Sequence, residues 1–391
     1  MDGEVSLRGD PAYGFVLRRA LEAAAQAPSD RLTHGFHVFP ARMHPAIART
    51  VLEELFEVGA AEVIDPFCGS GTVVVEAMRA GWSALGTDLN PLAIRVARVR
   101  SELRKQSSRD RFVEAVERVG RASTQRVQTR VDSRADLAPE HRAKYEIHVL
   151  KELAGLLAEI RRSASKADRA AMEMVFSSLV IKCSKQRSDT NVEEVTRTLR
   201  KGLATEMFVR KGRELGSRWA ALARAVPKDA EAPRLVCADI QQLRKTLGGH
   251  YQCNLILSSP PYGGTYDYVE HHRLRAGWLG VGLGAMEANE MGARRRFSEA
   301  PEGGPEDALA RWDAEVHGML ESMAGCLRRD GIAMLLVGDG EIGGVRVPAD
   351  EQLEKLAEKV GLEFLCSAAQ AREDVRGGPA RREHLVALIK R

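Results

Sequence analysis

The chain has 391 residues, of which 44% are hydrophobic and 29% charged, so it can form one large α/β domain with an insertion, or two domains. Its 58 Lys and Arg residues nearly balance its 54 Asp and Glu residues, and a net charge of +4 does not by itself indicate nucleic-acid binding. The sequence contains no apolar run of membrane-spanning length, no basic-then-apolar leader and no CxxC pair among its six cysteines. We therefore expect a cytoplasmic protein without a membrane span, a disulfide framework or a metal site.

Strand-like apolar runs alternate with helical patterns along much of the chain. Strands are expected at Glu62–Asp65, Ser83–Asp88, Leu235–Asp239, Asn254–Ser258, Ile332–Gly338, Glu363–Ser367 and His384–Ile389. Helices are expected at Ser70–Ala80, Pro91–Leu103, Asp307–Leu327 and Ala349–Val360. This alternation predicts a doubly wound α/β fold around a mostly parallel sheet.

The alternation stops between residues 101 and 231, where no strand candidate occurs. Helical patterns rich in Ala, Leu, Arg and Glu fill this stretch, most clearly at Lys144–Ala164, Lys166–Lys185 and Gly202–Ala225. We expect a helical insertion at 101–231, beginning with a loosely packed charged helix, within an α/β domain formed by 31–100 and 232–391. Gly280–Gly304, rich in Gly, Glu and Arg, is expected to be a mobile loop.

The turn Asp65–Thr72, with the sequence Asp-Pro-Phe-Cys-Gly-Ser-Gly-Thr, follows a strand and opens a helix. Its glycines let the backbone approach a ligand, and the helix N-terminus offers free N–H groups. The GK[ST] ending of a phosphate-binding loop and the third glycine of a dinucleotide loop are both missing. Asp88, at the end of the next strand, is placed to accept the ribose hydroxyls of an adenosine cofactor. Asp239 ends another strand, where it either accepts the adenine amino group or caps the following helix.

The most specific signal is Asn254–Tyr262, an apolar strand that runs into Ser-Ser-Pro-Pro-Tyr. Proline cannot continue a sheet and keeps its predecessor extended, so the strand ends in a stiff turn. The Ser259 hydroxyl and the Pro260 carbonyl can accept the two hydrogens of an exocyclic amino group, which directs the nitrogen lone pair at a methyl donor. Tyr262 can stack on a base that has been flipped out of the duplex. A rigid turn without chemistry is the alternative reading.

These motifs resemble those of the amino-group DNA methyltransferases. Asp65–Thr72 matches their cofactor loop, Ser259–Tyr262 their catalytic tetrapeptide, and Arg381–His384 their closing motif. Phe39–Pro45 looks like their additional cofactor motif, which covers the methionine end. Serine before Pro-Pro-Tyr is typical of enzymes that act on cytosine N4, whereas adenine enzymes more often carry Asp or Asn there.

The resemblance covers 31–100 and 232–391. It implies a Rossmann-like class I methyltransferase fold with a seven-stranded, mostly parallel sheet, and S-adenosylmethionine as the cofactor. The residues expected to act in catalysis are Ser259, Pro260, Pro261 and Tyr262. The residues expected to bind the cofactor are Phe39, Pro40, Asp65, Pro66, Phe67, Gly69, Gly71, Thr72, Asp88, Asn90 and Asp239. The implied activity is site-specific methylation of DNA, with a partner nuclease of a restriction–modification system as a further option.

The chain departs from many members of this family because its large insertion precedes the catalytic motif. Ile181–Asn191, a polar basic break between helices, is expected to contact DNA, although a solvated loop is as good a reading. Arg294–Arg296 is a second candidate for phosphate contact, with a solvated charge run as the alternative. His271 and His272 follow the catalytic turn, where they either contact the substrate or have a structural role, and the structural role is the more common of the two.

Four other functions remain open, three of them enzymatic. Pro-Pro-Tyr loops also occur in enzymes that methylate adenine N6 in DNA, guanine N2 in transfer RNA, or protein glutamine. The RNA enzymes often carry an extra RNA-binding domain, and the sequence predicts none here. A nucleic-acid-binding protein with a vestigial methyltransferase fold is the non-enzyme alternative, and the intact motifs speak against it.

Overall fold

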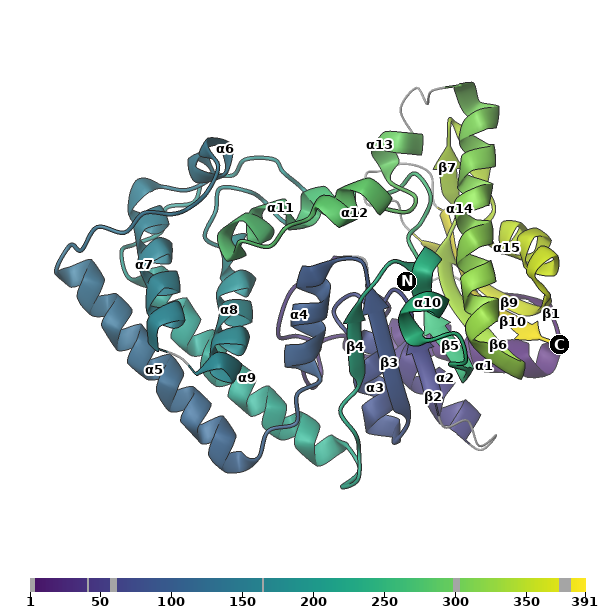
Figure 1. The fold of residues 1–391 in the computed structure, drawn as a ribbon, viewed down its shortest axis with the longest axis horizontal. Helices are drawn as coiled ribbons and strands as arrows, with labels where there is room; N and C mark the ends of the chain where they lie inside the picture. The colour runs from purple at the N-terminus through teal and green to yellow at the C-terminus, as the bar shows by residue number, and fades with distance from the viewer. Residues whose placement is uncertain (1–3, 41, 57–61, 164, 298–302, 373–380) are drawn as a thin grey trace.

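The fold is built on an eight-stranded sheet in the order β1-β9-β10-β6-β5-β2-β3-β4 (Figure 1). The computed structural model describes residues 4–40, 42–56, 62–163, 165–297, 303–372 and 381–391. The strands are β1 Ser6–Gly9, β2 Glu62–Asp65, β3 Ser83–Asp88, β4 Arg234–Cys237, β5 Cys253–Ser258, β6 Leu327–Gly338, β9 Leu362–Arg372 and β10 Arg381–Lys390. Strands β4, β3, β2, β5 and β6 are parallel to one another, whereas β10 is antiparallel to both β6 and β9.

The seven predicted strands are all present, but the sheet has eight strands rather than the expected seven. The additional strand, β1, pairs antiparallel with β9, with Ser6 opposite Ala369. All four of its residues are exposed, so the period-2 apolar pattern that marks a half-buried strand is missing from its sequence. The helix that follows β1 also packs on the sheet, so the α/β unit begins before the predicted boundary at residue 31.

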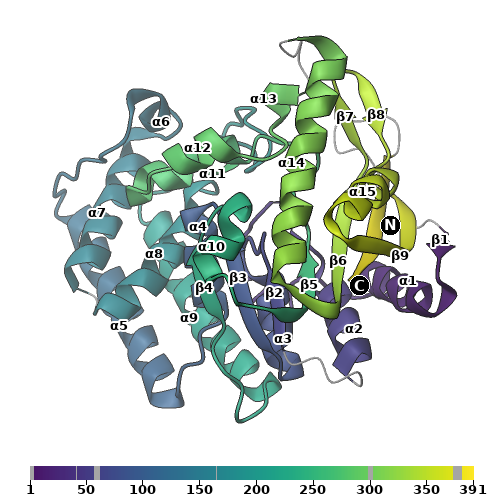
Figure 2. The same ribbon diagram turned by 45° about the vertical axis from the view of Figure 1, so that its right-hand side comes forward.

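Helices cover both faces of the sheet (Figures 1 and 2). One face packs against α1 Pro11–Gln26, α2 Pro45–Phe56 and α3 Thr72–Ala80. The other packs against η1 Ile240–Gln242, α10 Leu243–Leu247, α14 Gly304–Cys326 and α15 Ala349–Ala357, which continues into η2 Glu358–Val360. Because β5 is covered on both sides, its sequence is a continuous apolar run rather than an alternating one.

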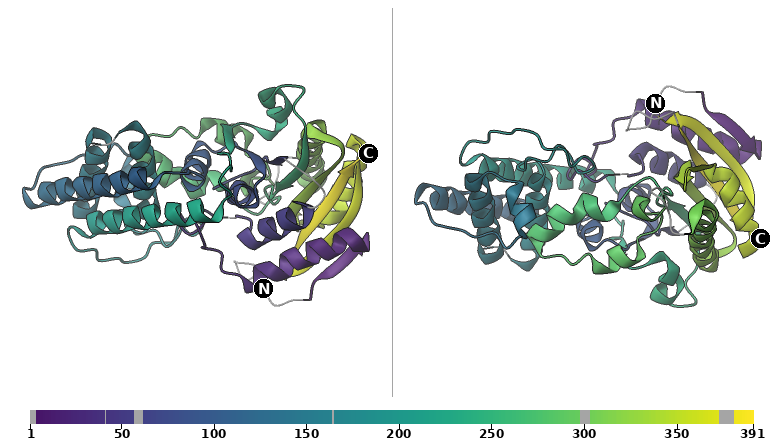
Figure 3. Two further views of the ribbon diagram at one scale, coloured as in Figure 1. Left: turned by 90° about the horizontal axis from the view of Figure 1, so that it is seen from below. Right: turned by 90° about the horizontal axis from the view of Figure 1, so that it is seen from above.

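A helical part lies at the end of the molecule away from the C-terminal strands (Figure 3). Its helices are α5 Gln106–Gln128, α6 Pro139–Ala143, α7 Ile147–Ser163, α8 Lys166–Val180 and α9 Leu203–Ala225. The loose packing expected at its start is wrong, because α5 buries Phe112, Val116 and Val119 in a core shared with α7, α8 and α9. Helix α4, Pro91–Arg100, contacts β3, β4 and α8 and so joins this part to the sheet.

The segment after the Ser-Pro-Pro-Tyr turn is largely helical. It contains α11 Tyr268–Leu279, α12 Gly284–Asn289 and α13 Arg294–Phe297. The loop expected at Gly280–Gly304 is therefore wrong for 284–289 and 294–297, which are helical, while 298–302 lie outside the described residues. A short hairpin, β7 Gly340–Ile342 and β8 Val345–Val347, turns at Gly343 and Gly344, which both have positive φ, as a tight two-residue hairpin turn requires.

Within the described ranges, no helix is both long and apolar enough to cross a membrane.

Candidate active site

A cavity opens at the carboxyl ends of the parallel strands, where the chain leaves β2, β3, β4 and β5. Ligands bind at this edge in open α/β sheets. The cavity brings together most of the residues predicted to hold a cofactor and part of the predicted catalytic turn. The predicted residues in its lining are Phe39, Pro40, Pro66, Phe67, Gly69, Asp88, Asn90, Asp239, Ser259 and Pro261.

The floor of the cavity is formed by the glycine turn and the end of β3. The amide of Gly69 donates a 2.8 Å hydrogen bond to Oδ2 of Asp88, and the amide of Asn90 donates a 2.7 Å bond to Oδ1. Burial raises the pKa of Asp88 to about 6, although both amides favour its charged form. Each carboxylate oxygen keeps a lone pair for a ligand hydroxyl.

Two further polar residues of the lining cap helices. Asn90 Oδ1 accepts from the amide of Leu92 at the start of α4, while its Nδ2 is buried without a partner in the described structure. Asp239 Oδ1 accepts from the amide of Gln241 at the start of η1. Asp239 therefore caps a helix, as one of its two readings expected, and it also lines the cavity.

Three predicted cofactor residues lie outside the lining of this cavity. Asp65 is buried, and its Oδ1 accepts a 2.6 Å bond from Ser258 Oγ and a 3.2 Å bond from the amide of Phe67. Burial raises its pKa to about 7. Gly71, with φ of 86°, is the residue just before α3 and lies so close to Ala97 that a Cβ on it would be 3.0 Å from the Ala97 Cβ. Thr72 is buried at the first position of that helix. These residues shape the turn rather than face the cavity.

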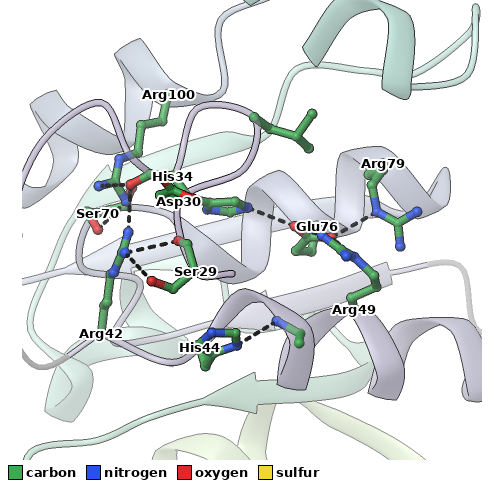
Figure 4. A network of polar contacts seen from close by, with 12 residues as sticks. Ser29, Asp30, His34, Arg42, His44, Arg49, Ser70, Glu76, Arg79 and Arg100 are labelled. Atoms are coloured by element: carbon green, nitrogen blue, oxygen red, sulfur yellow. Dashed lines mark hydrogen bonds and ion pairs between the residues drawn. The ribbon is translucent and has the colours of Figure 1, made fainter. Parts of the chain in front are cut away.

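A buried polar network holds the segment that carries Phe39 and Pro40 (Figure 4). Arg42 donates to the carbonyls of Ser29 and His34. Arg100 is fully buried and donates to Ser70 Oγ at 2.6 Å, to the His34 carbonyl at 2.9 Å and to the His37 carbonyl. Since Ser70 belongs to the glycine turn, Arg100 ties this turn to the loop that precedes α2.

The same network contains a buried carboxylate on α3. Glu76 is fully buried and accepts from His34 Nε2 at 2.8 Å, from Arg49 Nε at 3.1 Å and from Arg79 Nε at 2.9 Å. These hydrogen bonds and charges lower the pKa of Glu76 to about 2, against the effect of its burial. Helix α3, helix α2 and the loop before α2 are thereby held together behind the cavity.

The side of the cavity opposite the glycine turn includes a stacked aromatic pair. The ring of His272, on α11, stacks on Phe39 with centroids 4.7 Å apart and planes 28° apart. His272 lines the cavity together with Tyr268, Met286, Glu290 and Met291, none of which we predicted as cofactor ligands. Met286, Glu290 and Met291 lie in the segment expected to be a Gly- and charge-rich loop, and of the five only His272 stood out in the sequence, as a histidine after the catalytic turn.

The Ser-Pro-Pro-Tyr turn lies between this cavity and a second one. The second cavity is lined by Ser259, Pro260 and Tyr262 and, from other elements, by Ser29, Arg42, His44, Ile47, Tyr268, Leu336 and Glu383. Ser259 and Tyr268 line both cavities. The phenol of Tyr262 donates a 2.8 Å hydrogen bond to Glu383 Oε1, which fixes the ring at the wall of the second cavity.

The two basic segments singled out in the sequence both form ion pairs with other parts of the chain. Arg294 pairs with Asp267 at 3.1 Å, Arg296 pairs with Glu315 at 2.7 Å, and Arg295 pairs with Glu290. In the Ile181–Asn191 segment, Asp189 forms a buried ion pair with Arg275 of α11. Helix α11 therefore contacts both the cavity, through His272, and the helical part, through Arg275.

The strand order, with five parallel strands followed by an antiparallel β10 inserted between β6 and β9, defines a Rossmann-like class I methyltransferase fold. No protein-family model matches the chain. The chain is 34% identical over 88 residues to the type II methyltransferase M.MvaI of Kocuria varians, which is 22% of this chain and 19% of that protein. It is 31% identical over 81 residues to the type II methyltransferase M.MjaII of Methanocaldococcus jannaschii, which is 21% of this chain and 15% of that protein. The matched part thus spans less than a fifth of each relative's length.

Among solved structures, the chain aligns with TrmN from Thermus thermophilus at a TM-score of 0.32 and 13% identity, covering 95% of this chain and 53% of that one. It aligns with the rRNA methyltransferase aviRa from Streptomyces viridochromogenes at a TM-score of 0.33 and 12% identity, covering 95% and 94% of the two chains.

Proposed function

We propose that this protein is an S-adenosylmethionine-dependent methyltransferase that modifies the exocyclic amino group of a base in DNA, with cytosine N4 as the target. The observation that carries the proposal is the position of Ser259, which borders both the cavity at the glycine turn and the second cavity beside Tyr262. A donor in the first cavity and a planar base in the second would meet at this side chain.

The first cavity has the groups that an adenosine-containing cofactor requires. Asp88 offers carboxylate lone pairs for ribose hydroxyls, Asp239 offers an acceptor for the adenine amino group, and Asn90 offers a buried Nδ2 that lacks a partner in the described structure. Gly69 has φ of 49° and no side chain to fill the space in front of the ring of Phe39. S-Adenosylmethionine, when bound, supplies a methyl group on a cationic sulfur. When the amino nitrogen takes this methyl group, the sulfur becomes a neutral thioether and the nitrogen loses a proton.

The residues of the turn hold the acceptor base. The Ser259 hydroxyl and the Pro260 carbonyl accept the two amino hydrogens, which turns the nitrogen lone pair toward the first cavity. The two prolines restrict the backbone, so this orientation is set before the base arrives. Tyr262, anchored on Glu383, provides a flat surface for a base that has left its stack.

The proposal also specifies the substrate, DNA, and the atom that is methylated, cytosine N4. They are supported by the serine before Pro-Pro-Tyr and by the similarity to two type II methyltransferases. Adenine N6 in DNA and guanine N2 in RNA use the same amino-group chemistry and are the alternatives. We propose residues 101–231 as the part that contacts nucleic acid, through the segment between α8 and α9. In that segment Lys182, Arg187 and Lys201 are exposed basic residues.

The deciding experiment has two stages. Purified protein is incubated with labelled S-adenosylmethionine and either duplex DNA or total RNA, and modified positions are then mapped at base resolution in DNA from expressing cells. Label in DNA at cytosine N4 is the expected result. Label in RNA alone would replace the DNA assignment, and label in neither would refute the activity.

The role of Ser259 is tested separately. Ser259→Ala should bind the cofactor with wild-type affinity by calorimetry but lose methyl transfer by about 100-fold, in the range of a lost hydrogen bond to a reacting group. Ser83→Ala, at an exposed position at the start of β3 and so at the opposite edge of the sheet from the cavity, is the matched control and should transfer normally.

A further inference from the structure

His272 is a buried histidine in the wall of the first cavity whose position the sequence motifs do not explain. It lies on α11, is 1% exposed and stacks on Phe39. Its Nδ1 is buried and makes no hydrogen bond within the described residues. Buried polar atoms nearly always have a partner, so an unpaired nitrogen beside a cavity points to a ligand.

The location of His272 along the sheet edge indicates which part of a ligand it meets. Asp239, Asp88, Gly69 and Ser259 follow β4, β3, β2 and β5, which are neighbours in that order. If the adenosine lies on Asp88 and Asp239 and the methyl group faces Ser259, the amino-acid end lies over β2 at Gly69. The ring of Phe39 lies there, with its Cε1 3.4 Å from the position a Cβ on Gly69 would take. His272 stacks on this ring and is therefore at the same end.

The protonation state of His272 suits a cationic ligand. Burial lowers its pKa to about 3, so the imidazole is neutral at physiological pH. A neutral imidazole has one ring nitrogen that donates and one that accepts, which matches an ammonium or a carboxylate group. It also adds no positive charge next to a sulfonium.

We propose that His272 binds the zwitterionic amino-acid end of the cofactor through Nδ1 and, stacked on Phe39, fixes that end against the glycine turn. This inference rests on the proposed function, because it takes S-adenosylmethionine as the ligand of the first cavity.

Three ligands and two variants test it by calorimetry. S-Adenosylmethionine and S-adenosylhomocysteine have the amino-acid end, whereas 5′-methylthioadenosine lacks it. His272→Phe keeps a flat ring for stacking and removes both nitrogens, and His272→Asn keeps a polar group near the position of Nδ1. His317 is a half-buried histidine on α14 outside both cavities, so His317→Phe is the control for replacing a histidine by phenylalanine.

His272→Phe should bind the two complete ligands about tenfold more weakly and 5′-methylthioadenosine as well as the wild type does. His272→Asn should recover part of the loss, and His317→Phe should show none. Equal weakening of all three ligands by His272→Phe, or no weakening of any, would overturn the assignment. A wild-type protein that binds none of them would instead refute the proposed cofactor. Thermal melting without ligand checks that each variant is folded.

Discussion

The hydroxyl of Tyr262 donates a 2.8 Å hydrogen bond to Oε1 of Glu383, which joins the turn after β5 to the start of β10. The ring is also held from behind, because it lies against Gly338 at the end of β6, where a Cβ would be 2.6 Å from Tyr262 Cδ2. The aromatic wall of the second cavity is thus fixed by two strands that are distant in sequence. In the proposed function this ring is therefore in place before the base arrives, which is the condition under which stacking helps catalysis.

The first prediction concerns the carboxylate of Glu383. Glu383→Ala removes the acceptor for the Tyr262 hydroxyl and should lower kcat/KM about tenfold, which corresponds to about 1.4 kcal/mol. Glu383→Gln keeps an oxygen that accepts this bond and should retain most of the activity. Steady-state methylation of a duplex measures both, and cofactor affinity should remain unchanged. Equal loss in both variants would show that the negative charge, rather than the positioning of Tyr262, matters.

The second prediction concerns Gly338, which lies behind the ring of Tyr262. Gly338→Ala places a methyl group in the space now occupied by Tyr262, so the ring must move and methyl transfer should fall about tenfold or more. Binding of the cofactor, which we propose for the other cavity, should be unaffected. Gly282→Ala is the control, because a Cβ there has nothing within 4 Å. If Gly338→Ala transfers methyl groups at the wild-type rate, the ring position does not limit the reaction.

The third prediction concerns the pH dependence of cofactor binding. Asp88 has its pKa raised to about 6 by burial, and its charged form is the better acceptor for ribose hydroxyls. Affinity should therefore be constant from pH 8 to 7 and fall as the pH drops through 6, where the carboxylate takes up a proton. Calorimetry at several pH values measures this, and binding near pH 6 should release protons.

The matched variant for this prediction is Asp88→Asn, which cannot titrate. It should bind more weakly at pH 8, and its affinity should change little between pH 8 and 5. A wild-type profile that stays flat across pH 6 would contradict the role of Asp88 as a cofactor ligand.

The fourth prediction concerns stability. Glu76→Ala leaves His34, Arg49 and Arg79 around a buried gap and should lower the free energy of unfolding by about 3–5 kcal/mol. The pKa of Glu76 is lowered from 4.5 to about 2, so its contribution is complete above about pH 4.5 and is lost as the pH falls through 2. Urea unfolding at pH 7 tests the magnitude. The exposed pair of Arg200 and Glu206 is the comparison, and Glu206→Ala should change stability little.

Long-range pairing explains what the sequence could and could not predict of the fold. The strands of the sheet centre were predictable because each is a buried apolar run bounded by turn residues, as in Cys253–Ser258. β1 was not, because its four exposed residues carry no pattern and it forms only by pairing with β9, more than 350 residues away. The helices at Gly284–Asn289 and Arg294–Phe297 are short, and contacts such as Arg294 with Asp267 support them rather than an apolar period.

The residues of the candidate site likewise fall into those whose position the sequence predicts and those whose position it does not. Asp88, Asn90, Asp239 and Ser259 follow strand ends and could be placed at one sheet edge from the sequence. Asp65 also ends a strand, yet its side chain accepts hydrogen bonds from the Ser258 hydroxyl and the Phe67 amide and does not line the cavity. The sequence does not predict this orientation, because it depends on these local hydrogen bonds. His272 reaches the cavity through the packing of α11, and a helix with apolar and polar residues on all sides gives no sign of which face it buries.

Ser259 and Tyr268, which line both cavities, also have a consequence for inhibitor chemistry. If the two cavities hold the donor and the base as proposed, a single compound that links an adenosine moiety to an aminopyrimidine through a short spacer would fill both at once. Once one half is docked, the other is present at an effective concentration on the order of millimolar, so such a bisubstrate compound should bind far more tightly than either fragment. The spacer would pass the serine side chain, and its optimal length would report the separation that methyl transfer has to bridge.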